Sequence, residues 1–130
     1  MNEQETFDFV VSSVLKQGEP SINVHNPGTG SLACAYRSSS GLKCAAGFLI
    51  PDELYRAGFE GKTIVELVNL GLVKIDNLAL VSQLQAAHDW NAVAGSDFVS
   101  HFKKECRIIA RIYRLEWKFE TNETTTELTP

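Results

Sequence analysis

The sequence predicts a small α+β domain in which a β-hairpin, or a small antiparallel sheet, packs against four to five helices. Three features carry this prediction. Apolar residues recur at helical spacing in several stretches, and glycines follow these stretches. Two short strand-like runs flank a serine-rich turn at residues 38–41. The chain has 130 residues, of which 44% are apolar, so one core forms without help from a metal or a disulfide.

The first element is a helix over residues 4–17. Its apolar side chains follow intervals of three and four residues: Phe7, Val10, Val11, Val14 and Leu15. Gly18 is placed to close the helix in the left-handed conformation, and Pro20 follows it. Residues 19–31 are expected to form a loop, with a short extended piece at residues 21–25.

A β-hairpin is predicted next, with strands at residues 32–37 and 42–50. Gly41 suits the left-handed position of the short loop between them. Because side chains two residues apart share a face of a strand, Cys34 and Tyr36 are expected to point to the same side. The hairpin would thus present a thiol and an aromatic ring together.

Two short helices are expected after the hairpin. Pro51 fits the first position of one of them, and Gly58 is expected to end it. Thr63 and Glu66 have the spacing of a capping box, in which each side chain accepts a hydrogen bond from the other residue's backbone N–H. Gly71 should close this second helix.

Two longer helices complete the domain, at residues 77–91 and 96–114, with Ser96 as the expected N-cap of the second. The expected apolar face of the first comprises Leu80, Val81, Leu84, Ala87 and His88. That of the second comprises Val99, Phe102, Cys106, Ile109, Ala110 and Tyr113. The alternating residues 115–120 fit either a last strand or a helix end.

The domain is expected to span residues 1–120, with a polar, disordered tail at residues 121–130. The formal net charge is −4 and the pI about 5.3, which argues against bulk binding of nucleic acid. The acidic start does not resemble a secretory signal, and no apolar run is long enough to cross a bilayer. We therefore expect a cytoplasmic protein without a cofactor, whose three cysteines are free thiols.

Cys34 and Cys44 raise the question of a metal or a catalytic thiol. Zinc sites usually pair their cysteines only a few residues apart, whereas nine residues separate these two. A hydrolase would need a base beside one thiol, and His88, followed by Asp89, is the candidate. His88 falls on an apolar helix face, however. We therefore expect a buried histidine and packed thiols, with no catalytic residue and no metal ligand.

Tyr36, Arg37 and Lys43 suggest a ligand site at the hairpin. A guanidinium, an ammonium group and the amides of the serine-rich turn together have the chemistry to bind a phosphate or a carboxylate. An aromatic ring nearby can stack on a base. The competing interpretation is a hairpin edge that its charges keep soluble.

A basic stripe recurs at helical spacing in the last helix. It holds five of the chain's twelve Lys and Arg residues: Lys103, Lys104, Arg107, Arg111 and Arg114. The stripe fits an anion-binding face, a partner-binding face or a solvated helix face. Arg107 and Arg111 are the predicted contacts if it binds an anion.

The stretch CAYRSSSGLKCAAGFLIPDELY at residues 34–55, with the later Leu-Gln-Ala-Ala-His-Asp, resembles a family of small, largely uncharacterised phage and prophage proteins. The family pattern includes Cys-x-Tyr-Arg, then Gly-x-Lys-Cys-Ala-x-Gly-Cys-Leu-Ile-Pro-Asp, and the resemblance extends over roughly residues 5–115. It falls on Cys34, Tyr36, Arg37, Gly41, Lys43, Cys44, Gly47, Pro51, Asp52, Tyr55, His88 and Asp89. Phe48 stands where the family has a further cysteine, which favours packing over metal coordination.

The resemblance implies a viral or prophage origin and an accessory role against host defence. We expect a protein that binds and sequesters a phosphate-bearing, nucleotide-like signal without turning it over, and a homo-oligomer, because such sites often lie between subunits. The expected ligand contacts are Tyr36, Arg37, Lys43, His88, Arg107 and Arg111. One alternative is a protein inhibitor of a host defence enzyme or effector. A second is a small hydrolase that uses Cys34 or Cys44 with His88.

Overall fold

The fold of the chain was analysed in a computed structural model that describes residues 1–26, 28, 31–92 and 97–119. Four α-helices and a two-stranded antiparallel sheet lie in these ranges, which confirms the α+β class. The helices are α1 (Glu3–Gln17), α2 (Ile64–Asn69), α3 (Leu78–Ala92) and α4 (Phe98–Ile112), and the strands are β1 (Ile22–Asn26) and β2 (Ser31–Cys34). None of these helices is long and apolar enough to cross a membrane.

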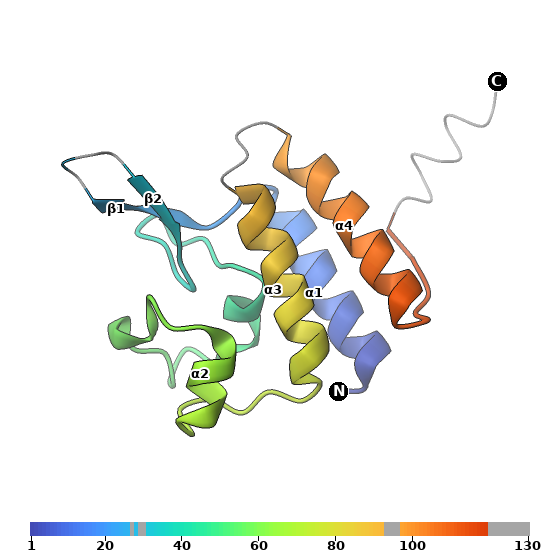
Figure 1. The fold of residues 1–130 in the computed structure, drawn as a ribbon, viewed down its shortest axis with the longest axis horizontal. Coiled ribbons are helices and arrows are strands. Elements are labelled where there is room, and N and C mark those ends of the chain that lie inside the picture. Colours follow the sequence, from blue (N-terminus) through green and yellow to red (C-terminus); the bar gives the residue numbers. More distant parts are fainter. Residues whose placement is uncertain (27, 29–30, 93–96, 120–130) are drawn as a thin grey trace.

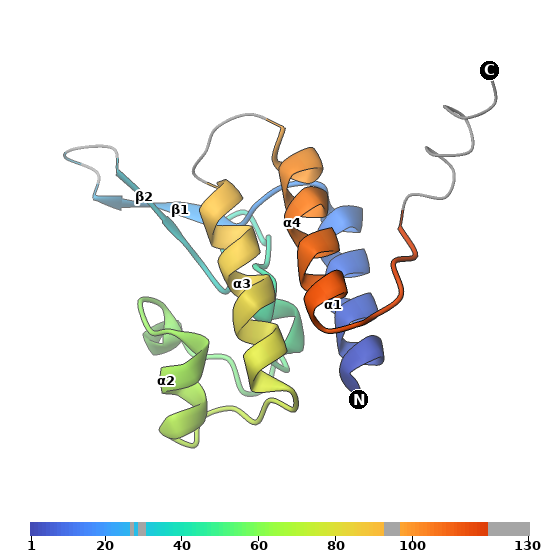
Figure 2. The ribbon, with the colours of Figure 1, turned by 45° about the vertical axis from the view of Figure 1, so that its right-hand side comes forward.

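Helices α1, α3 and α4 lie side by side and form the body of the domain (Figure 1). The sheet and α2 lie on the other side of α3 from α4, and a turn of 3₁₀ helix at Ala46–Leu49 contacts both α1 and α3 (Figure 2). The long segment between β2 and α2 therefore folds back against α3. The pocket described below lies where this segment meets α3.

Helix α1 forms as the sequence predicts. Asn2 and Glu5 make a capping box, and the predicted left-handed closure at Gly18 has φ 76°. The buried residues of α1 are Thr6, Phe7, Val10, Val11 and Val14. The four apolar residues of this set pack with α3 and α4 in one of two apolar clusters, and the second cluster lies beneath α2.

The predicted position of the hairpin is wrong. The observed hairpin pairs β1 with β2, so the piece predicted as a short extended segment is one of its strands. The expected strands at residues 32–37 and 42–50 share only one bridge among the described residues, between Arg37 and Lys43. Small residues at 44–47 are all buried in succession, which a compact 3₁₀ turn achieves and an alternating strand does not.

The short helix predicted after Pro51 is also wrong. Backbone N–H groups of Leu54 and Tyr55 both donate to the carbonyl of Pro51, which makes a single turn. Arg56 is then extended, and a 3₁₀ turn follows at Ala57–Phe59. This break brings the Tyr55 hydroxyl to the carboxylate of Glu60, at 2.5 Å.

The remaining helices follow the sequence closely. The capping box of Thr63 and Glu66 opens α2, and Gly71 follows it with φ 74°. The predicted apolar face of α3 is buried throughout. The N-cap of α4 is Asp97 instead of the predicted Ser96, because the Asp97 carboxylate accepts a hydrogen bond from Ser100 N at 3.3 Å. Ser96 lies outside the described residues.

Residues 115–119 form neither a strand nor a helix end, the two predicted alternatives. They run over α1 instead, where Gln4 exchanges two hydrogen bonds with the backbone of Glu116. The ring of Trp117 packs edge-on against Phe7, with 6.2 Å between the ring centroids. The tail predicted at residues 121–130 lies outside the described residues.

Candidate functional site

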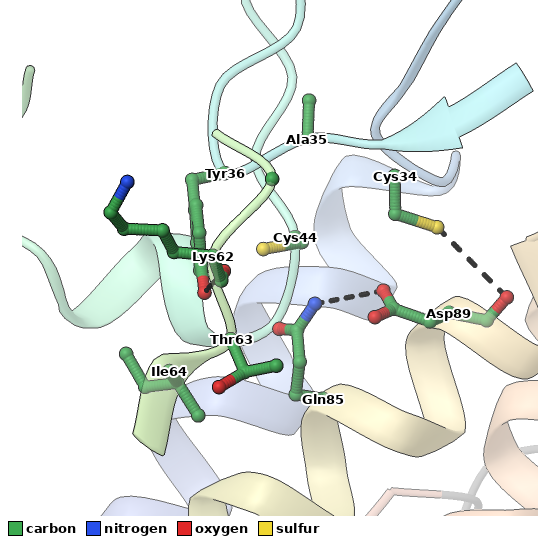
Figure 3. Close-up of a pocket in the computed structure, with 10 residues that line it drawn as sticks. Cys34, Ala35, Tyr36, Cys44, Lys62, Thr63, Ile64, Gln85 and Asp89 are labelled. Atoms are coloured by element: carbon green, nitrogen blue, oxygen red, sulfur yellow. Dashed lines mark hydrogen bonds between the residues drawn. The ribbon is translucent and has the colours of Figure 1, made fainter. Parts of the chain in front are cut away.

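A pocket of about 300 Å³ opens between the end of β2, the start of α2 and one face of α3 (Figure 3). Its apolar wall comes from Ala35, Tyr36 and Ile64, together with the thiols of Cys34 and Cys44. Its polar lining residues are Lys62, Thr63, Gln85 and Asp89, of which Lys62 turns its amine away from Asp89 (Figure 3). Residues from segments far apart in the sequence thus converge on one cavity.

Two donors hold the carboxylate of Asp89 in place. Gln85 Nε2 donates to Asp89 Oδ1 at 2.8 Å, and His88 Nδ1 lies 2.9 Å from the same oxygen. The Asp89 side chain is 42% exposed, whereas His88 is fully buried. Because both bonds end on Oδ1, Oδ2 remains as an acceptor for a hydrogen-bond donor.

His88 supports this carboxylate from behind. The backbone N–H of Ser21 donates to His88 Nε2 at 3.0 Å, so the hydrogen-bond network assigns the ring proton to Nδ1. Nδ1 then donates to Asp89. The imidazole is neutral, and the ring of Phe98 packs edge-on against it with 5.4 Å between the centroids. Both ring nitrogens are therefore already engaged.

One group of possible metal ligands occurs among the described residues: Cys34, His88 and Asp89, whose ligand atoms all lie within 4.8 Å of one another. A metal on Nδ1 of His88 would have to displace the proton that bonds Asp89. Since Nε2 already accepts a hydrogen bond, the ring would then be an imidazolate. The donor set fits a hydrogen-bonded triad better than a metal site.

The two thiols at the pocket are poor nucleophiles. Burial raises the pKa of Cys34 and that of Cys44 to about 12. Cys34 Sγ points to the backbone carbonyl of Asp89 at 3.9 Å, and His88 has no nitrogen left to accept a proton from it. Burial also raises the pKa of Cys106, which packs in the helical cluster. His88 is therefore not free to act as the base that the predicted hydrolase needs.

Gln85 connects the pocket to the 3₁₀ turn. Its Oε1 accepts a hydrogen bond from the backbone N–H of Ala46 at 2.7 Å, while its Nε2 donates to Asp89. Sequence reasoning did not select Gln85 or Lys62 as site residues. The available signal for Gln85 was its position four residues before Asp89, on the same face of a helix.

Arg37 and Lys43 converge on a different group, the carboxylate of Asp52. Arg37 Nη1 lies 2.8 Å from Asp52 Oδ1, and Lys43 Nζ lies 3.7 Å from the same oxygen. Arg37 Nη2 donates to the carbonyl of Ile50 at 2.7 Å, and the guanidinium lies 4.7 Å from the ring centroid of Tyr55. An acid from the chain itself thus stands where an anionic ligand was expected.

Glu60 takes up the backbone donors of the same region. Its two carboxylate oxygens accept hydrogen bonds from Tyr36 N at 2.9 Å and from Arg37 N at 3.1 Å. The hydroxyl of Tyr55 donates to Glu60 as well. The Tyr36 hydroxyl donates to the carbonyl of Lys62 at 2.6 Å, which fixes its ring along the pocket wall. Asp52 and Glu60 thus take up most of the donors around Arg37, the region that was expected to receive an anion, while Arg37 Nε is buried without an acceptor among the described residues.

The predicted contacts therefore divide among three places. Tyr36 lines the pocket, and His88 positions Asp89 beside it. Arg37 and Lys43 lie at Asp52. The two predicted contacts from the basic stripe, Arg107 and Arg111, lie on α4, which contributes no lining residue to this pocket. The guanidinium of Arg107 is 5.7 Å from the ring centroid of Trp117, and Arg111 is exposed.

Comparisons of the chain with protein-family models, with curated proteins and with solved structures found no match in any of the three. The resemblance of residues 34–55 to phage and prophage proteins stays a prediction.

Proposed function

We propose that this protein binds a phosphate-bearing, nucleotide-like small molecule in the pocket beside Asp89 and sequesters it without turning it over. The observation that carries the proposal is a half-exposed carboxylate, oriented by Gln85 and by a buried histidine, at the edge of an open cavity. Polar groups fixed in this way beside an apolar wall are typical of small-molecule sites.

The chemistry of the pocket suits an amino-bearing base. Its volume of about 300 Å³ lies at the small end of ligand pockets, which accommodates a mononucleotide better than a larger molecule. The apolar wall of Tyr36 and Ile64 can cover the face of a base. Asp89 then accepts a hydrogen bond from an exocyclic amino group. Lys62 is the exposed cation among the lining residues, and its Nζ, which donates to the carbonyl of Gly58 at 3.4 Å and points away from Asp89 (Figure 3), would turn toward the pocket to meet a phosphate.

Binding without turnover agrees with the groups around the pocket. The two thiols are protonated at neutral pH, and His88, which contacts Asp89, is engaged at both nitrogens. The resemblance to phage proteins adds a biological role to this chemistry. A phage accessory protein that removes a nucleotide signal from the host cytoplasm would blunt the defence that depends on that signal.

Calorimetric titration with cytidine and uridine monophosphates tests the proposal. The two ligands share the sugar and the phosphate, but only cytosine carries an amino group that can donate to Asp89. We expect cytidine monophosphate to bind and uridine monophosphate to bind roughly tenfold more weakly or not at all, and Asp89→Asn to remove this preference.

Asp52→Asn is the matched control for that titration, since it neutralises an exposed carboxylate outside the pocket. It should leave both affinities unchanged. The proposal is wrong if no nucleotide, including the adenine and guanine monophosphates, binds to the wild-type protein. It is equally wrong if binding is as tight in Asp89→Asn as in the wild type.

A second candidate function, inhibition of a host protein, is supported by a different surface. Leu54 and Leu72 are exposed around a hollow of about 480 Å³ beside α2, and Leu70 is exposed nearby. Exposed apolar side chains in such a group are a feature of protein-binding surfaces. This candidate predicts that a pulldown from host lysate yields a stoichiometric complex, and that Leu72→Ser abolishes it. The candidate is wrong if the protein retains no specific partner at low or moderate salt.

A further inference from the structure

The outer face of α3 and α4 exposes large apolar side chains. Trp90 is 78% exposed, Ile112 is 68% exposed and Ile108 is 43% exposed. They surround a shallow hollow of about 310 Å³, which Ala86 and Glu105 also line. Apolar groups gathered in this way lose contact with water when another protein surface covers them.

One acid and one base of α4 are placed symmetrically about Ile108. Glu105 precedes Ile108 by three residues and Arg111 follows it by three. At 3.6 residues per turn, both therefore lie on the same side of the helix as Ile108, one turn before it and one turn after it. The order along this face is acid, apolar, base.

We propose that this face binds a second copy of the chain, with the two α4 helices antiparallel about a two-fold axis at Ile108. In that arrangement each residue faces the one that lies equally far on the other side of Ile108. Glu105 then faces the partner's Arg111, and Arg111 faces the partner's Glu105. The two copies of Ile108 meet at the axis, and Lys104 lies against the partner's Ile112.

Self-complementarity is the reason for choosing a second copy as the occupant. A two-fold interface presents the same patch from both sides, so every acid must find a base at the symmetry-related position. The pair of Glu105 and Arg111 meets this condition, and the apolar centre with a charged rim matches the usual anatomy of an interface. The dimer leaves the Asp89 pocket open, because α4 contributes no lining residue to that pocket.

Charge reversal tests the pairing through the mass of the protein in solution. We expect sedimentation equilibrium to give a dimer for the wild type. Arg111→Glu and Glu105→Arg each place like charges opposite one another twice in the dimer, so each should weaken association by roughly tenfold or more. The double variant Glu105→Arg/Arg111→Glu restores opposite charges and should restore the dimer.

Lys74→Glu, a reversal of an exposed charge outside this face, is the matched control and should remain dimeric. Thermal unfolding of each variant separates loss of association from loss of fold.

A wild type that is monomeric throughout a dilution series overturns the proposal, as does a double variant no more dimeric than the singles. A monomer that captures a host protein, and loses it in Ile108→Glu, would assign the face to that partner and also overturn the proposal. None of these outcomes depends on whether the pocket binds a nucleotide.

Discussion

Two regions of this molecule gather polar side chains, one around Arg37 and one around Asp89, and they use them in different ways. Around Arg37, most donors meet an acceptor from the chain: Asp52 and the carbonyl of Ile50 for the two Nη atoms, and Glu60 for the backbone N–H. Nε of Arg37 is buried and meets no acceptor among the described residues. Around Asp89, donors from the chain converge on one carboxylate oxygen and leave the group facing an open cavity. The first region holds a segment in place, and the second presents an acceptor.

The difference shows that a cationic side chain identified in the sequence can be paired within the fold and so be unavailable to a ligand. Arg37 and Lys43 looked like an anion site because their partner, Asp52, comes from a turn whose folded position the sequence does not reveal. Asp89 looked like an accessory to His88. The structure reverses the roles, with His88 buried and Asp89 at the pocket.

The largest effect is expected from removing Glu60. Glu60→Ala leaves the backbone N–H groups of Tyr36 and Arg37 and the hydroxyl of Tyr55 without their acceptor. Hydrogen bonds to a charged group contribute about 1.5–3 kcal/mol each, and water can replace some of them, so we expect a loss of about 3 kcal/mol in the free energy of unfolding. Urea unfolding measures it.

Glu53→Ala is the matched control for that experiment, because Glu53 is an exposed acid of the same segment. It should change the free energy of unfolding by less than about 0.5 kcal/mol. If Glu60→Ala cost no more than Glu53→Ala, the Arg37 region would not be held together by internal pairing, and the comparison drawn above would fail.

A smaller loss is expected from Gly47→Ala. A Cβ atom at Gly47 would lie 2.4 Å from the carbonyl oxygen of Tyr36, so the 3₁₀ turn must move away from the pocket wall. Overpacking of this kind costs about 1–3 kcal/mol. Gly58→Ala is the control, since a Cβ there meets nothing within 4 Å. Equal melting temperatures for the two variants would show that the close packing of Gly47 is not needed.

A smaller loss of stability is expected from removing the N-cap of α2. Thr63 accepts a hydrogen bond from Glu66 N at 3.1 Å, and Glu66 returns one to Thr63 N at 2.8 Å. Thr63→Ala removes the first of these and should cost about 1 kcal/mol, whereas Thr63→Ser keeps the hydroxyl and should cost less. Chemical denaturation of the two variants distinguishes them, and an unchanged midpoint for Thr63→Ala would count against the cap.

The smallest effect at neutral pH is expected from the buried thiols, because their ionisation lowers the free energy of unfolding only at alkaline pH. Their pKa is near 9 in an unfolded chain and about 12 in the folded protein, for both Cys34 and Cys44. As pH rises, the unfolded state loses these protons first, so the stability is complete below pH 9 and falls between about 9 and 12. Cys44→Ala should make this fall shallower than in the wild type. Parallel curves for the two proteins would show that the Cys44 thiol is not protected by burial.

The helices could be predicted because local signals agree with the final packing. The stripe of α1, the capping box of α2 and the buried face of α3 all depend on residues within a few turns of one another. The hairpin was misplaced because alternation and a glycine turn at residues 38–41 favour a strand pair, while tight contacts with α1 and α3 favour a 3₁₀ turn. The 3₁₀ turn is therefore favoured by tertiary contacts, which the spacing of nearby residues in the sequence does not indicate.

The candidate site was only partly predictable for the same reason. Tyr36 and His88 were identified from residue type and position, and both lie at or behind the pocket. The pairing of Arg37 with Asp52 spans fifteen positions, and that of Ser21 with His88 spans 67. Contacts over such separations decide which polar groups remain available, and they form only when the chain has folded.

Amide chemical shifts during a titration with cytidine monophosphate would test the central claim most directly. The account predicts that the shifts concentrate at the pocket, in residues 34–36, 61–64, 85 and 89, and that Asp89→Asn abolishes them. Shifts that concentrate instead at Arg37, Lys43 and Asp52 would contradict it. They would show that a ligand displaces Asp52 and that the internally paired region, not the open pocket, is the binding site.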